Sequence, residues 1–340
     1  MLPFLRSVPR RLVFALGGGI LGAAVLFSCI IVTLGPPRTE LSEMSRVFRA
    51  FRPVEPAASQ TIGGDLTLEP PVQPVKAPAL PVLKGEMLAS DALTAESVVV
   101  KDETSGIVLF RKFEYKRHPI ASMTKLMSAL VIIERDLDWS SRATVVEDAV
   151  NDTHMYAGDT YTLEELWQTG LIGSSNKAIL TLVDATGMTR EAFALRMNEK
   201  AREIGLLDAT FVEPTGLDQE NKASAADMAL LLEEALRSEK IQTTLMTPEY
   251  TIYSAERKKK HHLWNTNWLL LGWIPHPFQE IRGWKTGYIP AAGYNFATQV
   301  VGDKGQVLDV VVLGAPTNEA RFTEAKAAAE WVLREYEWPE

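Results

Sequence analysis

The chain has 340 residues, of which 46% are hydrophobic and 23% are charged, with a formal net charge of −8 and one cysteine. This length and composition are sufficient for one or two globular domains with a sizeable core. The acidic balance argues against a nucleic-acid-binding protein, because no large surplus of basic residues is available to neutralise phosphates. A single cysteine excludes an intramolecular disulfide bond and leaves export neither supported nor excluded.

The N-terminal region predicts attachment to a membrane. Residues 12–34 carry no charge and are long enough to cross a bilayer as one helix. Arg6, Arg10 and Arg11 precede this run, so residues 1–11 are expected in the cytoplasm. A cleaved signal peptide is the alternative, but the apolar run is longer than a usual signal-peptide core and lacks a clear A-x-A cleavage site. We therefore expect an uncleaved, single-pass anchor in the cytoplasmic membrane, with the rest of the chain on the periplasmic or extracellular face.

Residues 35–88 are predicted to be a proline-rich linker, because residues 36–81 hold nine of the 19 prolines and show no sustained periodicity. A folded domain is predicted for residues 89–340. Two hairpins are expected from β-rich runs around glycine-containing turns, at residues 96–113 and 293–315.

Helices are expected where apolar residues recur at helical spacing, in four segments: 162–186, 189–206, 224–238 and 318–336. Strands at both ends of the domain with helices between them predict an α+β fold. Its antiparallel sheet would be flanked by helices, with a mostly helical lobe inserted in the middle.

The segment HPIASMTKLMSALVIIE, residues 118–134, raises the question of function. Its apolar part is typical of a helix that is buried on every side. Lys125 nevertheless stands at the start of this helix, three residues after Ser122, so the two side chains share one face. Burial lowers the pKa of a lysine, and a neutral lysine can take the proton of a neighbouring serine and make it a nucleophile. The alternative is a lysine that reaches solvent and a serine that only caps the helix.

The S-x-x-K motif is not specific by itself, since a second match occurs at Ser174–Lys177. The order of three motifs is more informative. Ser122-x-x-Lys125 is followed by Ser174-x-Asn176 and then by Lys285-Thr286-Gly287. This trio, in this order, is the set found in penicillin-binding proteins and class A β-lactamases.

Residues 89–337 resemble the low-molecular-weight penicillin-binding proteins, which are D-alanyl-D-alanine carboxypeptidases and related endopeptidases. Besides the three motifs, the segments FVEPTGLDQENKASAADMALLL, NTNWLL and GWKTGYIPAAGYNFAT match family signatures. The resemblance implies a β-lactamase/transpeptidase-like fold and peptidoglycan stem peptides as substrates. It also implies covalent inhibition by β-lactam antibiotics.

The resemblance implies a role for each motif residue. Ser122 would attack the D-Ala peptide bond with Lys125 as its base, Ser174 would pass a proton to the leaving amine, and Asn176 would bind Lys125 or the substrate. Lys285 and Thr286 would hold the terminal carboxylate.

Two further roles concern the motif strand. Gly287 would let the substrate backbone approach closely. The backbone N–H groups of Ser122 and Tyr288 would form the oxyanion hole. An edge strand that bears these residues would let the peptide add as an extra strand.

Two departures from the family pattern are present. Lys177 stands where many members have an acidic residue, which is expected to alter the charge near the site. The chain also stops after the catalytic domain, without the β-rich C-terminal domain of many carboxypeptidases, so residues 12–34 are expected to supply the membrane attachment.

The leading hypothesis is a carboxypeptidase that removes the terminal D-Ala of stem pentapeptides. The main alternative is an endopeptidase that cuts D-Ala cross-links. The segment EPTGL, with Glu213 and Thr215, favours this alternative. A β-lactamase and a catalytically silent wall-binding protein are further alternatives. Glu213 lies after the second motif, as the deacylating glutamate does in class A β-lactamases, but it belongs to the peptidase signature.

The remaining polar and aromatic clusters do not indicate a cofactor. The five histidines show no paired ligand spacing, so neither a metal nor a cofactor is expected. Residues 257–262, RKKKHH, are predicted to be a solvated loop whose charge helps to hold an anionic wall polymer. The tryptophans at 264, 268, 273 and 284 are expected in the core and in the wall of the site.

Overall fold

The computed structural model describes residues 80–145, 152 and 154–339. The predicted cytoplasmic segment, the predicted anchor at residues 12–34 and the linker up to residue 79 lie outside the described residues. Within the described ranges, no helix combines the length and the apolar character needed to cross a bilayer. Residues assigned to the end of the linker belong to the fold, because β1 (Val82–Leu83) pairs antiparallel with β13 (Tyr336–Glu337).

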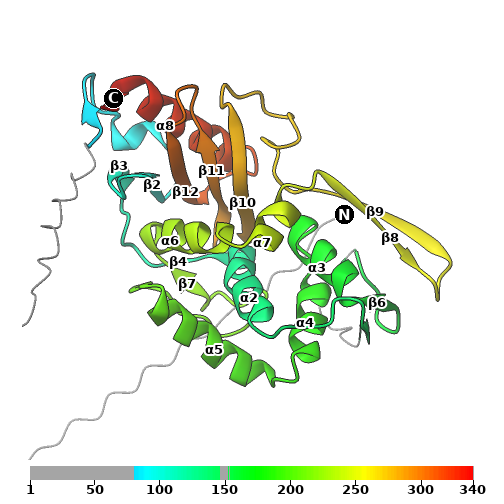
Figure 1. The fold of residues 1–340 in the computed structure, drawn as a ribbon. Coiled ribbons are helices and arrows are strands. Elements are labelled where there is room, and N and C mark those ends of the chain that lie inside the picture. Colours follow the sequence, from blue (N-terminus) through cyan, green and yellow to red (C-terminus); the bar gives the residue numbers. More distant parts are fainter. Residues whose placement is uncertain (1–79, 146–151, 153, 340) are drawn as a thin grey trace, which may run out of the picture. The chain divides into compact units, whose positions relative to one another are not determined.

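A five-stranded antiparallel sheet forms the centre of the described unit (Figure 1). In spatial order its strands are β10 (Glu280–Ile289), β11 (Gly293–Val301), β12 (Val307–Ala315), β2 (Ser97–Asp102) and β3 (Val108–Lys112). Both predicted hairpins are confirmed, as β2–β3 and β11–β12. The expected motif strand, β10, is an edge strand of this sheet.

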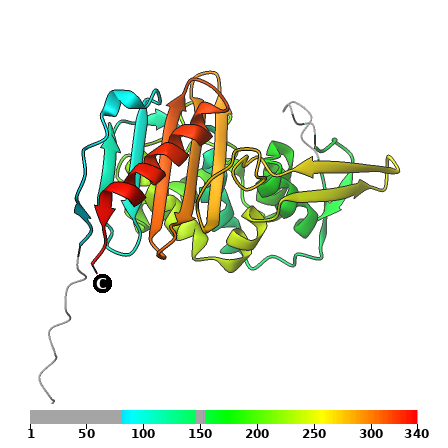
Figure 2. The same cartoon turned by 90° about the horizontal axis from the view of Figure 1, so that it is seen from above.

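Helices cover both faces of the sheet. The valine-rich central strands β12 and β2 are buried almost throughout, which β-branched side chains suit. Helix α8 (Ala320–Glu335) crosses one face (Figure 2), and α6 (Ala225–Leu236) packs against the same strands from the helical lobe. The predicted α+β fold, with an antiparallel sheet flanked by helices, is confirmed.

The lobe between the two parts of the sheet is mostly helical, as predicted. Its helices, besides α6, are α2 (Thr124–Ile133), α3 (Leu163–Ile172), α4 (Asn176–Ala185), α5 (Arg190–Glu203) and α7 (Glu239–Leu245). Capping boxes start two of the lobe helices: Thr162 and Ser224 pair with the third residue of α3 and of α6. The predicted helical segment 162–186 is interrupted between α3 and α4, and this break contains Ser174.

Smaller β elements complete the lobe, and the sequence did not predict them. They are the antiparallel pairs β4 (His118–Pro119) with β7 (Lys222–Ala223), β5 (Arg142–Thr144) with β6 (Thr160–Thr162), and β8 (Glu249–Ser254) with β9 (Lys259–Trp264). The loop predicted for residues 257–262 is therefore wrong for residues 259–262, which belong to β9. The charged residues there form β9, because alternate positions such as Leu263 and, on β8, Ile252 are buried against the lobe.

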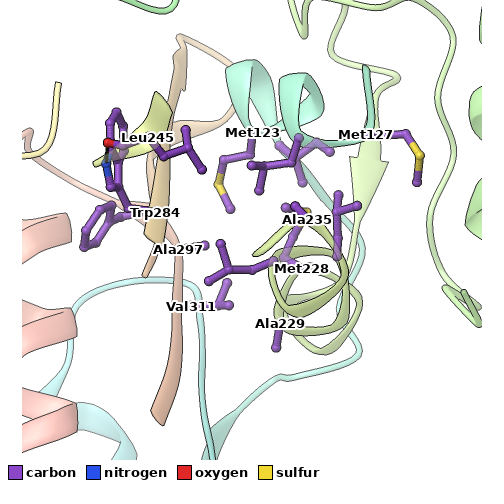
Figure 3. Close-up of a cluster of buried hydrophobic side chains, with 14 of the residues drawn as sticks. Met123, Met127, Met228, Ala229, Ala235, Leu245, Trp284, Ala297 and Val311 are labelled. Atoms are coloured by element: carbon purple, nitrogen blue, oxygen red, sulfur yellow. Dashed lines mark hydrogen bonds between the residues drawn. The ribbon is translucent and has the colours of Figure 1, made fainter. Parts of the chain in front are cut away.

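An apolar core joins the sheet to α2, α6 and α7 (Figure 3). Trp284 of β10 is fully buried there, and its indole N–H donates to the carbonyl oxygen of Leu245 at 2.5 Å. The expectation of a core position is confirmed for this tryptophan. It is wrong for Trp264 and Trp273, whose side chains are 53% and 56% exposed.

Candidate active site

Ser122 lies in a single 3₁₀ turn, η2 (Ala121–Met123), that leads directly into α2. The residue before it, Ala121, has φ +50°, a conformation that side chains other than glycine rarely adopt. Two glycines leave room for this turn. A Cβ on Gly216 would lie 1.9 Å from the carbonyl oxygen of Ala121, and one on Gly287 would lie 2.5 Å from that of Ile120. The tertiary packing therefore holds the serine in a strained turn between a loop and the sheet edge.

Lys125 is fully buried one turn further on, as its position in the sequence predicts. Its Nζ donates to three oxygens: Ser122 Oγ at 2.8 Å, Asn176 Oδ1 at 2.7 Å and the carbonyl oxygen of Thr215 at 2.7 Å. Burial lowers the pKa of Lys125 to about 7, although the negative charges of Glu213 and Asp152 act in the opposite direction. A lysine with this pKa is substantially neutral near pH 7, and its lone pair can then accept the proton of Ser122.

A second lysine–serine pair joins the other two motifs. Ser174, in the break between α3 and α4, has φ +60°, and Lys285 Nζ of β10 donates to its Oγ at 2.9 Å. Lys285 is fully buried, and burial lowers its pKa well below the usual range, with further lowering from the positive charges of Lys125 and Arg321. The hydroxyl of Thr286 lies 2.7 Å from that of Thr266. The S-x-N and K-T-G motifs, 111 residues apart at Ser174 and Lys285, therefore meet at one place.

The edge strand β10 brings the last two predicted residues beside the nucleophile. Tyr288 follows Gly287 there, and its ring, 49% exposed, stacks on Tyr294 of β11 at 4.3 Å between centroids. The missing Cβ of Gly287 lets β10 itself approach the η2 turn. The close approach of a substrate backbone to this residue stays a prediction. Among the described residues, no strand pairs with the outer edge of β10, the edge to which an extended peptide is expected to add.

Comparison with known proteins agrees with this geometry. The family model for D-alanyl-D-alanine carboxypeptidases, peptidase family S11, matches residues 84–317. The chain belongs to this family. The predicted resemblance to the penicillin-binding peptidases is thereby confirmed, and the chain is a member of a family of serine hydrolases that act as peptidases.

Curated relatives of this S11 peptidase include both predicted activities. The D-alanyl-D-alanine carboxypeptidase DacF of Bacillus subtilis is 31% identical over 264 residues, which cover 74% of this chain and 66% of that protein. The D-alanyl-D-alanine endopeptidase of Pseudomonas aeruginosa is 27% identical over 262 residues, which cover 75% of this chain and 82% of that protein.

Solved structures of the same fold include penicillin-binding proteins. The ampicillin-bound form of penicillin-binding protein D2 from Listeria monocytogenes matches with a TM-score of 0.62 and 26% identity, over 74% of this chain and 100% of that one. A point mutant of the Streptomyces K15 DD-transpeptidase matches with a TM-score of 0.63 and 22% identity, over 71% and 98% of the two chains. This second likeness shows the fold.

The sequence did not predict that Glu213 stabilises a turn beside the active site of this S11 peptidase. Its carboxylate accepts hydrogen bonds from the backbone N–H of Thr215 at 2.7 Å, from that of Gly216 at 2.5 Å and from Asn221 Nδ2 at 2.5 Å. These bonds form the turn that presents the Thr215 carbonyl oxygen to Lys125. The signal was the glutamate two residues before Thr215 in EPTG, where an acidic side chain can bind the backbone of a following turn.

Two further charged residues of the S11 site were missed. Asp152 accepts a hydrogen bond from the backbone N–H of Lys177 at 2.9 Å and from Ser175 Oγ at 2.5 Å, and so lies at the N-terminus of α4. Lys177 itself is buried beside Asn176, and its expected effect on the charge of the site stays a prediction. Arg321 of α8 reaches the sheet edge, where its Nη1 donates to the carbonyl oxygen of Gly287 at 3.3 Å and burial lowers its pKa to about 10.

Proposed function

We propose that the chain is a serine-type D-Ala-D-Ala carboxypeptidase that removes the terminal D-Ala of peptidoglycan stem pentapeptides through an acyl-enzyme on Ser122. The observation that supports this most directly is the buried, low-pKa Lys125 hydrogen-bonded to Ser122 Oγ. Residues 12–34 would anchor it to the cytoplasmic membrane, with the catalytic domain on the outer face.

The reaction would proceed in two stages. Lys125 removes the proton of Ser122, whose Oγ attacks the carbonyl carbon of the penultimate D-Ala. The oxyanion accepts hydrogen bonds from the backbone N–H groups of Ser122 and Tyr288. Collapse of this intermediate expels the terminal D-Ala, whose amine takes a proton through Ser174. Water then hydrolyses the ester, which releases the shortened peptide and restores the serine.

The carboxylate of the terminal D-Ala would bind at Lys285 and Thr286. A negative charge next to Lys285 raises the pKa of this buried amine, so the substrate restores the positive charge that holds it. The pentapeptide backbone would extend along the free edge of β10. β-Lactam antibiotics would acylate Ser122 in the same way, and the ampicillin and cefotaxime complexes of the Listeria protein support this.

An endopeptidase that cuts D-Ala cross-links is the second candidate. The match with the Pseudomonas endopeptidase spans 82% of that protein, against 66% of the Bacillus carboxypeptidase. Both reactions use the same nucleophile and differ in whether the leaving amine is a free amino acid or a cross-linked side chain.

Incubation of the purified protein with sacculi, followed by mass spectrometry of the muropeptides, separates these activities. We expect pentapeptides to be lost and free D-Ala to appear while dimers persist. A fall of dimers to monomers would establish the endopeptidase. A fluorescent penicillin should label the protein and fail to label Ser122→Ala, whereas an unlabelled wild type would contradict both peptidase activities. Rapid turnover of a chromogenic cephalosporin would indicate a β-lactamase.

A further inference from the structure

The β8–β9 hairpin lies against α3 of the helical lobe, and its tip extends past that helix (Figures 1 and 2). One face of this ribbon packs inward through buried residues such as Ile252 and Leu263. The opposite face, called the outer face below, is exposed. Its residues are Glu249, Thr251 and Tyr253 on β8 and Lys260, His262 and Trp264 on β9.

Aromatic rings lie at both ends of the outer face. Tyr253 pairs with Lys260 towards the tip of the hairpin, and Trp264 pairs with Glu249 at its base. Trp264 lies four positions after Lys260 in β9, which places the two aromatic positions roughly 13 Å apart along the ribbon. Trp273 lies beside Trp264, with 6.5 Å between ring centroids. The side chains of Tyr253, Trp264 and Trp273 are 50%, 53% and 56% exposed, so about half of each remains available to a partner.

Polar groups separate the aromatic rings. The hydroxyl of Thr251 lies 2.9 Å from His262 Nδ1, and the ring of His262 contacts that of Trp264 with 4.9 Å between centroids. Lys260 adds a positive charge, and the carboxylate of Glu249 lies 3.4 Å from His262 Nε2. The outer face therefore alternates aromatic and hydrogen-bonding groups and contains no aliphatic side chain.

This pattern fits a sugar chain better than a lipid surface. Sugar rings present C–H groups on their faces, which pack on aromatic rings, and hydroxyl groups at their edges, which need hydrogen-bonding partners. A membrane-binding surface needs a continuous apolar face, and the carboxylate of Glu249 beside Trp264 opposes anionic lipid headgroups. The spacing of the aromatic positions exceeds one sugar ring and matches a short run of linked rings.

The outer face is also connected to the active site. Trp264 is two residues before Thr266, whose hydroxyl contacts that of Thr286 in the K-T-G motif. A polymer on the outer face would therefore lie next to the edge of β10, where the proposed function places the stem peptide. In peptidoglycan, that peptide is covalently attached to a glycan strand.

We propose that the outer face of the β8–β9 hairpin, together with Trp273, binds a peptidoglycan glycan strand and thereby positions the attached stem peptide at β10. The identity of the polymer rests on the proposed function. Of the basic segment predicted to hold a wall polymer, Lys260 and His262 lie on this face. They would bind sugar hydroxyl groups, and the aromatic rings would supply the contacts to the sugar faces.

The test uses peptide-free glycan strands, prepared from sacculi with an amidase, and cosedimentation with the purified full-length protein. We expect the wild type to bind and the double variant Trp264→Ala/Trp273→Ala to bind at least about tenfold more weakly. Tyr115→Ala, which removes a 66% exposed aromatic ring outside the hairpin, is the matched control and should bind normally. Trp264→Phe should retain most of the binding, because a flat ring remains.

A small-molecule readout separates this proposal from the proposed function. Acylation by a fluorescent penicillin should be unchanged in the double variant, because that reaction needs no glycan. Binding of the double variant at wild-type strength would overturn the inference. So would binding of the wild type to phosphatidylglycerol-containing vesicles but not to glycan. Glycan binding by a protein that no penicillin labels would refute the proposed function and leave the hairpin site supported.

Discussion

Among individual residues, the two buried lysines decide what the site can do. Lys125 and Lys285 are both fully buried, and each donates a hydrogen bond to a serine hydroxyl. Burial of a charged ammonium group is unfavourable, so it lowers the pKa of each lysine, and the hydrogen bonds partly compensate for the lost contact with water. For Lys125, the negative charges of Glu213 and Asp152 partly oppose the effect of burial on the pKa. Its pKa therefore stays within the range where a base works at neutral pH.

The first prediction concerns the pH dependence of acylation. Since Lys125 must be neutral to act as a base and its pKa is about 7, the acylation rate should fall as the pH drops through about 7. Glu213→Gln removes a negative charge that raises this pKa, so the midpoint of the profile should move to lower pH. The measurement is the rate of penicillin acylation between about pH 5 and about pH 9, values chosen to bracket the expected midpoint.

Glu220→Gln is the matched control for this experiment, because Glu220 lies in the same loop but is exposed and pairs with Lys222. Its profile should coincide with that of the wild type. An unshifted midpoint in Glu213→Gln would show that another group titrates. A longer-lived acyl-enzyme in that variant, with unchanged acylation, would instead assign Glu213 to deacylation.

Among the secondary-structure elements, the contact between β10 and the η2 turn is decisive. The strand carries Lys285, Thr286 and Tyr288, and the turn carries Ser122. Gly287 permits the close approach of the two elements, because any side chain there would meet the backbone of the turn. The position of β10 relative to the nucleophile therefore depends on the absence of a side chain at Gly287.

Gly287→Ala tests that contact. The added methyl group would lie 2.5 Å from the carbonyl oxygen of Ile120, so β10 and η2 must separate. We expect acylation by penicillin to slow by about 10–100-fold, since small displacements of reacting groups have effects of this size. In Gly272→Ala the methyl group meets nothing within 4 Å, although φ is +69°. This control should lose some thermal stability and retain acylation. Equal losses of activity in both variants would argue against the proposed contact.

In the described unit as a whole, burial places a carboxyl group at the centre of the sheet. Asp309 of β12 is fully buried and accepts a hydrogen bond from Gln299 Nε2 at 2.9 Å. Burial, followed by the nearby carboxylate of Glu233, raises the pKa of Asp309 well above its usual range. The folded protein therefore binds a proton at neutral pH that the unfolded chain releases. The free energy of unfolding falls as the pH rises from 3.8, the ordinary pKa of the carboxyl, to about 9, its pKa in the folded protein.

Asp309→Asn should remove this dependence, because an amide stays neutral at every pH. Its melting temperature should exceed that of the wild type by about 3 °C at about pH 8, and the difference should shrink towards about pH 5. Asp303→Asn changes an exposed carboxylate in the adjoining turn and should show no such trend. Thermal unfolding followed by circular dichroism measures both. A difference that is constant with pH would mean that Asp309 is ionised in the folded protein.

Local patterns determined much of this protein. β-Rich runs around glycine-containing turns predicted both hairpins of the sheet, and helical periodicity predicted most helices. The order of three short motifs predicted the family and the residues that meet at the site. These features depend on neighbours a few residues away, which a sequence displays directly.

Only the tertiary structure decided the rest, because the contacts involved join residues far apart in the chain. The Thr215 carbonyl oxygen bonds Lys125 across 90 positions, and Arg321 reaches the carbonyl oxygen of Gly287 across 34. The strand β9, the positive φ of Ala121 and the exposure of Trp264 likewise follow from packing against distant segments. A sequence shows which residue types are present, but the free energy of each such contact depends on which groups the complete fold brings together.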